Sequence, residues 1–537
     1  MYKSIVALFS VIYLLLLSVI IKYVSSYGWD DASITLAFGK TLANYGRYSL
    51  NEVSEIVEGS SSNLLVFLSA IITKLFQPNF YQIITWSQYN ALFFSFVTFF
   101  LTYKLFNKDF NNWQKLTLII LISLFPMFFM EIINGMEMTM FSALLLLFIY
   151  FHRRKSFFIY CIIPFLLLVR FEAAFYLIMS LIFVYFFDVK NKIFNFKLLF
   201  YSFSILLILT VLRYVYFGQV LPNTVLAKMN PPYSGTTDFE MLKQKLSGVK
   251  EFIITFSFII LALVLIIYNQ RKHFTLFLNI ELSFIISFFI FSIIAGQNVG
   301  YTGRMLLPVL PIFILYFTDV YRYIHKKNTF KFIFSIIILS ILVNYKTYRQ
   351  VYQYAKTGGF YQHLYLPEST EKEAQNKMNL YFYGVTPENY KVTGIAIDDL
   401  RHNLELKTIK FMTPDVGGIG LSTDKIIILD SALLTNKFLA NNGYSHFYIY
   451  LETRVPDVIE THEGWSTYSK IFDSSFFKDN YVPIIFENNF VWLHKKHIEK
   501  IKLLKHEFII NTKVSKNTRY FEGDILPYKN FTVLKIL

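Results

Sequence analysis

Long apolar runs recur through the first two thirds of this chain and restrict its fold more than any other feature. A helix needs about 20 mostly apolar residues to cross a bilayer. With 55% hydrophobic and 16% charged residues, the chain of 537 residues is too apolar for an ordinary soluble protein. We expect about eleven transmembrane helices, at 4–24, 84–106, 114–131, 136–151, 156–169, 172–187, 197–217, 250–268, 274–295, 303–320 and 329–345.

Two apolar segments have an alternative interpretation, a signal peptide for 4–24 and an interfacial helix for 64–76. The run at 4–24 is longer than the apolar part of a signal peptide, about 7–15 residues, and no small-residue cleavage site follows, so we expect a retained helix. The run at 64–76 is short and contains Lys74, which favours an interfacial helix over a span. The single cysteine, Cys161, excludes an intramolecular disulfide.

The basic residues predict the orientation, because cytoplasmic loops carry an excess of Lys and Arg. If 64–76 does not cross and the N-terminus is cytoplasmic, the acidic and polar turns at 30–58, 131–137 and 218–250 lie outside, and the basic clusters lie inside. A crossing at 64–76 would invert every later loop and break this pattern. We therefore expect no crossing there, a cytoplasmic N-terminus and an exterior C-terminal domain. The basic clusters are Lys104/Lys108/Lys115, HRRK at 152–155, Lys190/Lys192/Lys197, Arg271/Lys272 and Arg322/Lys326/Lys327/Lys331.

The net charge of +15 is spread over these short loops, as expected of loops facing anionic lipid, so we expect no nucleic-acid partner. The region 346–537 differs in kind from the rest. It alternates short apolar runs with turns, as in KIIILDSALL and HFYIYLETRVPDV. This pattern predicts a soluble exterior α/β domain. The other domain is then the membrane domain 1–345, with a first exterior loop at 25–83 that contains juxtamembrane helices.

The first exterior loop begins with two adjacent aspartates, Asp30 and Asp31. Apolar residues then recur at helical spacing from Ile34 to Tyr45, and Gly46 stands where a helix C-cap is expected. The pattern predicts a membrane-surface helix with one apolar face, capped by an aspartate. One aspartate suffices for a cap. The alternative is that the pair holds a general base or a divalent cation at the edge of the membrane.

Several short motifs follow one another along the chain. They are DDA (30–32), GRYSLN (46–51), VEGSSSNLL (57–65), NGMEMTMF (134–141), VRFEAAFY (169–176), FGQVLPNTVLAKM (217–229), GRMLLPVLP (303–311) and DVGGIGLSTDKIIILDSALL (415–434). In this order they resemble the motifs of GT-C-fold glycosyltransferases that use lipid-linked sugars, and most of all those of the AftB-like arabinofuranosyltransferases. In EGSSSNLL the aromatic residue and the proline of the family's stretch are missing.

This resemblance implies a GT-C fold, a polyprenyl-phosphate sugar donor and an inverting single displacement. Such a reaction needs a base for the acceptor hydroxyl and cations for the leaving phosphate. Asp30 and Asp31 are the base candidates, and the sequence does not distinguish between them. Arg304 is the first choice for the phosphate, because arginine binds phosphate through a fork of donors. Further candidates for the donor phosphate or substrate are Arg170, Lys228, Glu137, Glu172, Asn223 and Asn63.

Structural alternatives remain for several of these candidates. Arg170 and Glu172 could form an ion pair, Lys228 could be an interfacial lysine, and Asn223 could shape a turn after Pro222. The sequence specifies no cofactor, although the aspartate pair could hold a divalent cation.

The leading hypothesis is a multi-pass glycosyltransferase of the bacterial plasma (inner) membrane. It would transfer arabinofuranose, or another pentose or hexose, to a cell-surface glycan acceptor at the periplasmic face. The alternative hypothesis is a polytopic transporter or flippase of lipid-linked glycan intermediates. Transporters tend to carry internal repeats or charges within spans, and the sequence shows acidic residues in the exterior loops instead. A membrane polymerase or ligase of another type, or a glycan receptor, is a third class.

Overall fold

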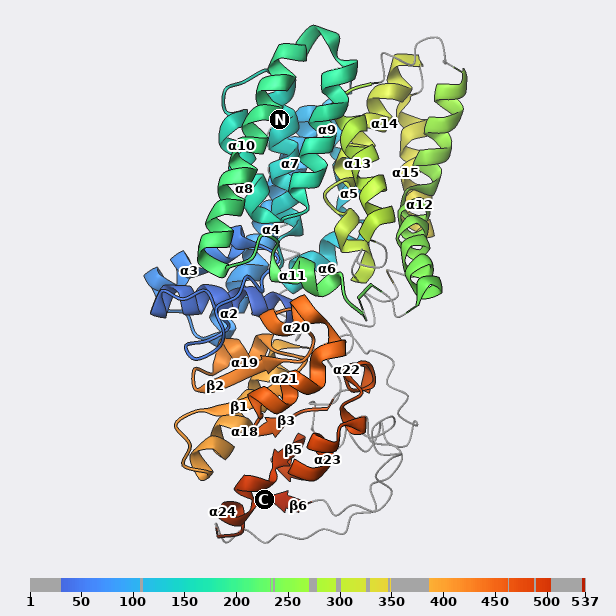
Figure 1. The fold of residues 1–537 in the computed structure, drawn as a ribbon. Coiled ribbons are helices and arrows are strands. Elements are labelled where there is room, and N and C mark those ends of the chain that lie inside the picture. Colours follow the sequence, from blue (N-terminus) through green and yellow to red (C-terminus); the bar gives the residue numbers. More distant parts are fainter. Residues whose placement is uncertain are drawn as a thin grey trace.

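The computed structural model describes residues 30–106, 110–231, 233–234, 237–269, 278–295, 301–324, 329–345, 348, 386–461, 463–486, 489–503 and 534–536. The first expected span, 4–24, lies outside these residues. Figure 1 shows a bundle of helices stacked on a smaller domain of strands and short helices, with α2 (Asp30–Tyr45) and α3 (Asn63–Phe76) between them. The functional site described below lies at this junction.

Aromatic side chains hold the helices of the bundle together. The rings of Tyr176 and Phe288 stack with centroids 3.8 Å apart, and those of Phe256 and Phe313 with centroids 4.6 Å apart. These contacts join α9 to α13 and α12 to α14. The bundle helices are α4 (Phe80–Leu105), α5 (Asn112–Ser123), α6 (Pro126–Asn134), α7 (Met138–Arg153), α8 (Ile159–Val169), α9 (Ala173–Phe187), α10 (Lys192–Phe217), α12 (Asp238–Asn269), α13 (Ile280–Ala295), α14 (Leu310–Ile324) and α15 (Thr329–Val343).

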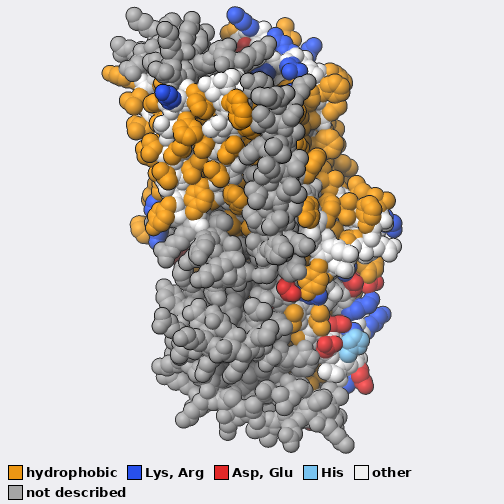
Figure 2. Space-filling model, turned by 180° about the vertical axis from the view of Figure 1, so that it is seen from behind, with side chains coloured by type: hydrophobic (Ala, Val, Ile, Leu, Met, Phe, Trp, Pro, Cys, Tyr) orange, Lys and Arg blue, Asp and Glu red, His pale blue; other side chains and the backbone are white. Residues whose placement is uncertain are grey.

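The bundle carries an apolar outer surface suited to lipid. Figure 2 shows hydrophobic side chains over the helices and Lys and Arg side chains at the end away from the C-terminal domain. Within the described residues, two helices are long and apolar enough to cross a membrane, Val189–Phe217 and Phe239–Ile266, and α5 with α6, bent by 61°, would make a third. The expected count of about eleven spans is therefore not confirmed, because most other apolar helices are shorter than a bilayer crossing requires.

The segment that follows Asp30 contains the predicted helix, but its buried residues are not confined to one apolar face. Gly46 has φ of +66° and ends α2, since a left-handed conformation favours glycine. Buried positions surround α2, because α3 packs on one side and the C-terminal domain on the other. At Gly39 a Cβ would lie 2.5 Å from the Ser69 Oγ on α3. The two helices therefore approach too closely for a larger residue.

The C-terminal domain is built on a mixed sheet. Its described residues form six strands in the order β2-β1-β3-β5-β4-β6, with β1 parallel to β2 and β3, and β5 antiparallel to β3 and β4. Ile34 and Phe38 of α2 share one apolar core with this domain. The strands are β1 (Ile409–Thr413), β2 (Ile426–Asp430), β3 (Val458–Ile459), β4 (Tyr481–Phe486), β5 (Asn489–His494) and β6 (Leu534–Ile536).

Short helices connect these strands. Because β1 and β2 are parallel, the glycine-rich segment between them forms a crossover helix, α19 (Gly417–Ser422), which packs against α2. The other helices of the domain are α18 (Pro387–Asn403), α20 (Lys437–Asn442), α21 (Phe447–Arg454), α22 (Glu463–Ser469), α23 (Ser475–Asn480) and α24 (Ile498–Leu503).

Candidate active site

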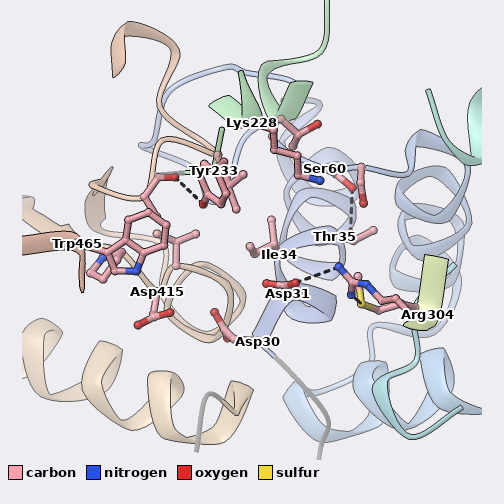
Figure 3. Close-up of a pocket in the computed structure, with 18 residues that line it drawn as sticks. Asp30, Asp31, Ile34, Thr35, Ser60, Lys228, Tyr233, Arg304, Asp415 and Trp465 are labelled. Atoms are coloured by element: carbon pink, nitrogen blue, oxygen red, sulfur yellow. Dashed lines mark hydrogen bonds and ion pairs between the residues drawn. The ribbon is translucent and has the colours of Figure 1, made fainter. Parts of the chain in front are cut away.

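A polar cavity of about 320 Å³ lies where loops at one end of the bundle meet the C-terminal domain (Figure 3). Its walls come from segments far apart in the sequence. Asp31 is contributed by α2, Lys228 by the short helix α11 (Asn223–Lys228), Arg304 by the 3₁₀ helix η4 (Tyr301–Leu306), and Asp415 and Trp465 by the C-terminal domain. The fold therefore brings three carboxyl groups, of Asp30, Asp31 and Asp415, and two cations to one space.

Asp31 is the accessible member of the aspartate pair. Its side chain is 45% exposed, and its Oδ2 lies 3.5 Å from Arg304 Nη2. In Figure 3 it points toward Arg304 from the first turn of α2. A carboxylate that is open to the cavity and held by one cation can accept a proton from a bound hydroxyl.

Asp30 occupies a different environment, although it is the neighbouring residue and also borders the cavity. It is 3% exposed, and its two carboxylate oxygens accept the backbone N–H groups of Gly417 and Gly418, each at 2.7 Å. The Ser33 Oγ donates a third hydrogen bond at 2.8 Å. Burial, with repulsion from Asp415, raises the pKa of Asp30 from 3.8 to about 7, against the lowering effect of these hydrogen bonds. Asp30 therefore faces the C-terminal domain.

Lys228 stands at the junction of the polar cavity with a second, larger cavity. Partial burial lowers the pKa of its ammonium group, the Glu172 carboxylate opposes that shift, and the Arg170 guanidinium adds to it. Lys228 and Tyr233 line both cavities. A ligand that occupies both spaces would therefore pass this lysine.

The second cavity is an apolar groove of about 720 Å³. Its walls are mostly apolar side chains of α9, α12 and α13, among them Phe175, Met241 and Phe291. Glu172 and Lys245 supply charged groups to the same lining. The groove is larger than the polar cavity and suits a long apolar chain.

An aromatic wall closes one side of the polar cavity. The rings of Tyr233 and Trp465 have centroids 5.4 Å apart, and the Tyr233 hydroxyl donates to the Ala432 carbonyl at 3.0 Å. Two aromatic faces beside polar groups are typical of small-molecule sites. The sequence predicts neither residue, because neither belongs to a periodic pattern and their proximity depends on the packing of the two domains.

Three predicted substrate residues form a buried ion-pair cluster behind the cavity. The guanidinium of Arg170 donates to Glu172 at 2.7 and 3.1 Å and also to Glu137, whose Oε1 accepts from Ser61 at 3.2 Å. Arg170 is 2% exposed and Glu137 is fully buried. The structure thus shows the ion pair that the sequence analysis named as the alternative for Arg170 and Glu172. Glu172 also borders the apolar groove.

The two predicted asparagines hold loops in place. The Asn223 amide is buried and donates to the carbonyls of Leu433 and Leu434 at 3.1 and 2.8 Å, which ties α11 to the C-terminal domain. The Asn63 amide donates to Glu58 at 2.6 Å, at a small separate cavity of about 30 Å³. Both side chains position the walls of the site.

The possible divalent cation finds limited support at the aspartate pair. Within the described ranges, no group of three His, Cys, Asp or Glu side chains is placed to hold a metal ion. The Asp30 oxygens already accept amide hydrogens, so Asp31 is the member of the pair that presents an open carboxylate.

Comparisons with known proteins found similarity in structure but no match in sequence. No family model and no curated protein matches the sequence of this chain. Among solved structures, the chain is similar to the Archaeoglobus fulgidus oligosaccharyltransferase tethered through a disulfide bond to an acceptor peptide containing the NVT sequon. The sequence identity is 12% and the TM-score is 0.48, and the similarity covers 91% of this chain and 74% of the oligosaccharyltransferase.

Proposed function

We propose that this protein is an integral membrane glycosyltransferase that moves a sugar from a polyprenyl-phosphate donor to a glycan acceptor. The observation that carries this proposal is that Lys228 lines both the polar cavity and the apolar groove. The proposed donor has the same order of parts. Its sugar would occupy the polar cavity, its phosphate would lie at Lys228, and its hydrocarbon tail would follow the groove.

The proposed reaction is a single displacement with inversion at the anomeric carbon. Asp31 removes the proton from the acceptor hydroxyl as the acceptor oxygen bonds to that carbon. The bond from the carbon to the phosphate oxygen breaks, and polyprenyl phosphate leaves with the electron pair. Lys228 and Arg304 stabilise the developing negative charge, since both line the cavity.

The family resemblance of the motifs extends the proposal. It favours a GT-C enzyme related to the AftB-like family, with residues 1–345 as the catalytic membrane domain and 346–537 as the exterior domain. The donor would carry arabinofuranose or another pentose or hexose. The acceptor would be a cell-surface glycan at the periplasmic face of a bacterial inner membrane.

The test uses the full-length protein in lipid vesicles with synthetic polyprenyl-phosphate sugars and oligosaccharide acceptors. Asp31→Asn should lower kcat about 10²–10⁴-fold, the usual contribution of a general base. Asp399→Asn is the matched control, because Asp399 is exposed on α18. Release of polyprenyl phosphate separates transfer from flipping, since a flippase leaves its cargo intact. Full activity in Asp31→Asn at normal protein levels would rule out the base.

A further inference from the structure

We propose that Asp30 is a positioning residue that fastens the C-terminal domain onto α2 and thereby completes the cavity around Asp31. The inference rests on the proposed function of Asp31 as the base. It separates the roles of two adjacent aspartates, with Asp31 directed at the substrate and Asp30 directed at the protein.

The contacts of Asp30 match this role. Each carboxylate oxygen accepts one backbone N–H at 2.7 Å, from Gly417 and Gly418 at the start of α19. These bonds link positions almost 400 residues apart in the sequence. Hydrogen bonds to an ionised acceptor are stronger than those between neutral groups. Asp30 therefore makes a specific two-point connection between the first exterior loop and the C-terminal domain.

The glycine pair is fitted to this contact. A Cβ at Gly417 would lie 2.2 Å from the Ser33 Oγ and 2.4 Å from the Asp30 carbonyl oxygen. A Cβ at Gly418 would lie 2.1 Å from the Pro387 carbonyl oxygen. Such distances are far below van der Waals contact, so a side chain at either position would push α19 away from α2 or α18.

The contact between Asp30 and α19 affects the cavity, because the residues directly before α19 form part of the cavity wall. Pro414, Asp415 and Val416, which directly precede Gly417, line the cavity opposite the bundle residues. If α19 moved away from α2, this wall would move with it. Loss of the Asp30 contact should therefore open the site while leaving the Asp31 carboxylate intact.

Other bonds between the first exterior loop and the C-terminal domain lie farther from the cavity. Asn51 Nδ2 donates to the Ile426 carbonyl at 2.8 Å, and Lys40 Nζ donates to the Leu421 carbonyl at 3.1 Å. These bonds can keep the domain associated when Asp30 is changed. Asp30→Asn should then loosen α19 locally without unfolding the protein.

A disulfide can test whether Asp30 acts through docking. The Cβ of Leu50 lies 3.2 Å from the position of a Cβ at Gly420, close to the spacing of about 3.5–4.5 Å in disulfides. Leu50→Cys with Gly420→Cys, in a Cys161→Ser background, would join the first exterior loop to α19. We expect Asp30→Asn to slow formation of this disulfide about tenfold, because an amide side chain accepts one N–H and opposes the other.

The activity measurements complete the test. Asp30→Asn and Gly417→Ala should both lower kcat/KM about tenfold or more. The formed disulfide should restore most of that loss in Asp30→Asn but not in Gly417→Ala, because the added methyl group still clashes with Ser33 and Asp30. Asp31→Asn with the disulfide should stay inactive. An Asp30→Asn protein that remains inactive although the disulfide forms at the normal rate would make Asp30 the base and overturn the proposal.

Two further outcomes are decisive. Full activity in Asp30→Asn would show that the contact is dispensable. The disulfide rate needs no substrate, so it reports docking even if the protein proves not to be a glycosyltransferase. Failure of the docking role and failure of the proposed function are therefore distinguishable.

Discussion

Lys228 is the residue on which the two halves of the proposed donor site depend, because it lines both the polar cavity and the apolar groove. Lys228→Met should raise the donor KM roughly 10–100-fold, the value of a hydrogen bond to a charged group. Lys243→Met is the control, since Lys243 is exposed on α12. A donor KM that is unchanged in Lys228→Met would remove Lys228 from the phosphate site.

The pH dependence of the donor KM gives a second test of Lys228. Burial lowers the pKa of Lys228, so its charge is lost at a lower pH than that of an ordinary lysine. We expect the donor KM of the wild-type protein to rise as the pH increases through this pKa. Lys228→Arg should remove that alkaline rise, because an arginine stays protonated. The KM measured across the alkaline range checks this.

The buried carboxyl group of Asp430 makes the stability of the folded protein depend on pH. It is 1% exposed at the end of β2, and burial raises its pKa from 3.8 to about 7, although Thr435 and Ala432 donate hydrogen bonds to it. Between these values the folded state binds more protons than the unfolded state, so stability falls as the pH rises. The slope is at most about 1.4 kcal/mol per pH unit for one carboxyl group.

Thermal unfolding of the full chain in detergent from pH 4 to pH 8 measures this slope. Asp430→Asn should flatten it without abolishing it, because Asp30 also has a raised pKa and acts in the same direction. Asp399→Asn should leave the slope as it is. An unfolding midpoint that rises with pH in the wild-type protein would contradict the assignment.

At the scale of elements, α2 shows what the sequence could and could not predict. Its extent followed from apolar spacing and from Gly46, both of which are local signals. The burial of Asp30 and of most of the helix did not, because that depends in part on α19, which lies almost 400 residues away. Asp30 and Asp31 look equivalent in the sequence. Only the packing of α19 makes one buried and the other open to the cavity.

The candidate site likewise contains residues that the sequence predicted and residues that it did not. Motif order led to Asp31, Lys228 and Arg304, which the structure brings to one cavity. It also led to Arg170, whose side chain lies in a buried ion pair. No local pattern marked Trp465 or Tyr233, because single aromatic residues are common in this chain and the wall that these two share forms only when the domains meet. Long-range packing therefore accounts for what the sequence left open.

The short helix α3 makes a prediction about the membrane. Its side chains Phe67, Ile71, Leu75 and Phe76 are exposed, with Leu75 at 68%, and Lys74 lies in its last turn. An apolar exposed face beside a lysine is typical of a helix lying in the membrane interface. We therefore expect α3 to lie on the lipid surface.

A spin label at Leu75→Cys, in a Cys161→Ser background and in vesicles, tests this position. Its relaxation should respond more to oxygen, which concentrates in lipid, than to a water-soluble nickel complex. A label at Asp399→Cys, on the exposed side of α18, should show the opposite preference. Equal responses to both reagents at Leu75→Cys would place α3 in water.

At the scale of the whole molecule, the distribution of basic side chains and the position of the proposed site predict the same orientation in the membrane. Basic side chains gather at the end of the bundle away from the C-terminal domain (Figure 2). The turns from α7 to α8 and from α9 to α10 contain Arg154, Lys155 and Lys190. The positive-inside rule therefore predicts that this end faces the cytoplasm. The cavity and the C-terminal domain would then face the exterior, where a cell-surface glycan would be built.

Cysteine labelling in whole cells checks this orientation. With Cys161→Ser as background, a membrane-impermeant maleimide should react with Lys425→Cys on the C-terminal domain in intact spheroplasts. Lys190→Cys should react only after permeabilisation, because Lys190 is exposed at the opposite end of the bundle. Labelling of Lys190→Cys alone in intact cells would put the cavity in the cytoplasm. An acceptor on the cell surface could not reach Asp31 there, so the same result would also exclude the proposed periplasmic acceptor.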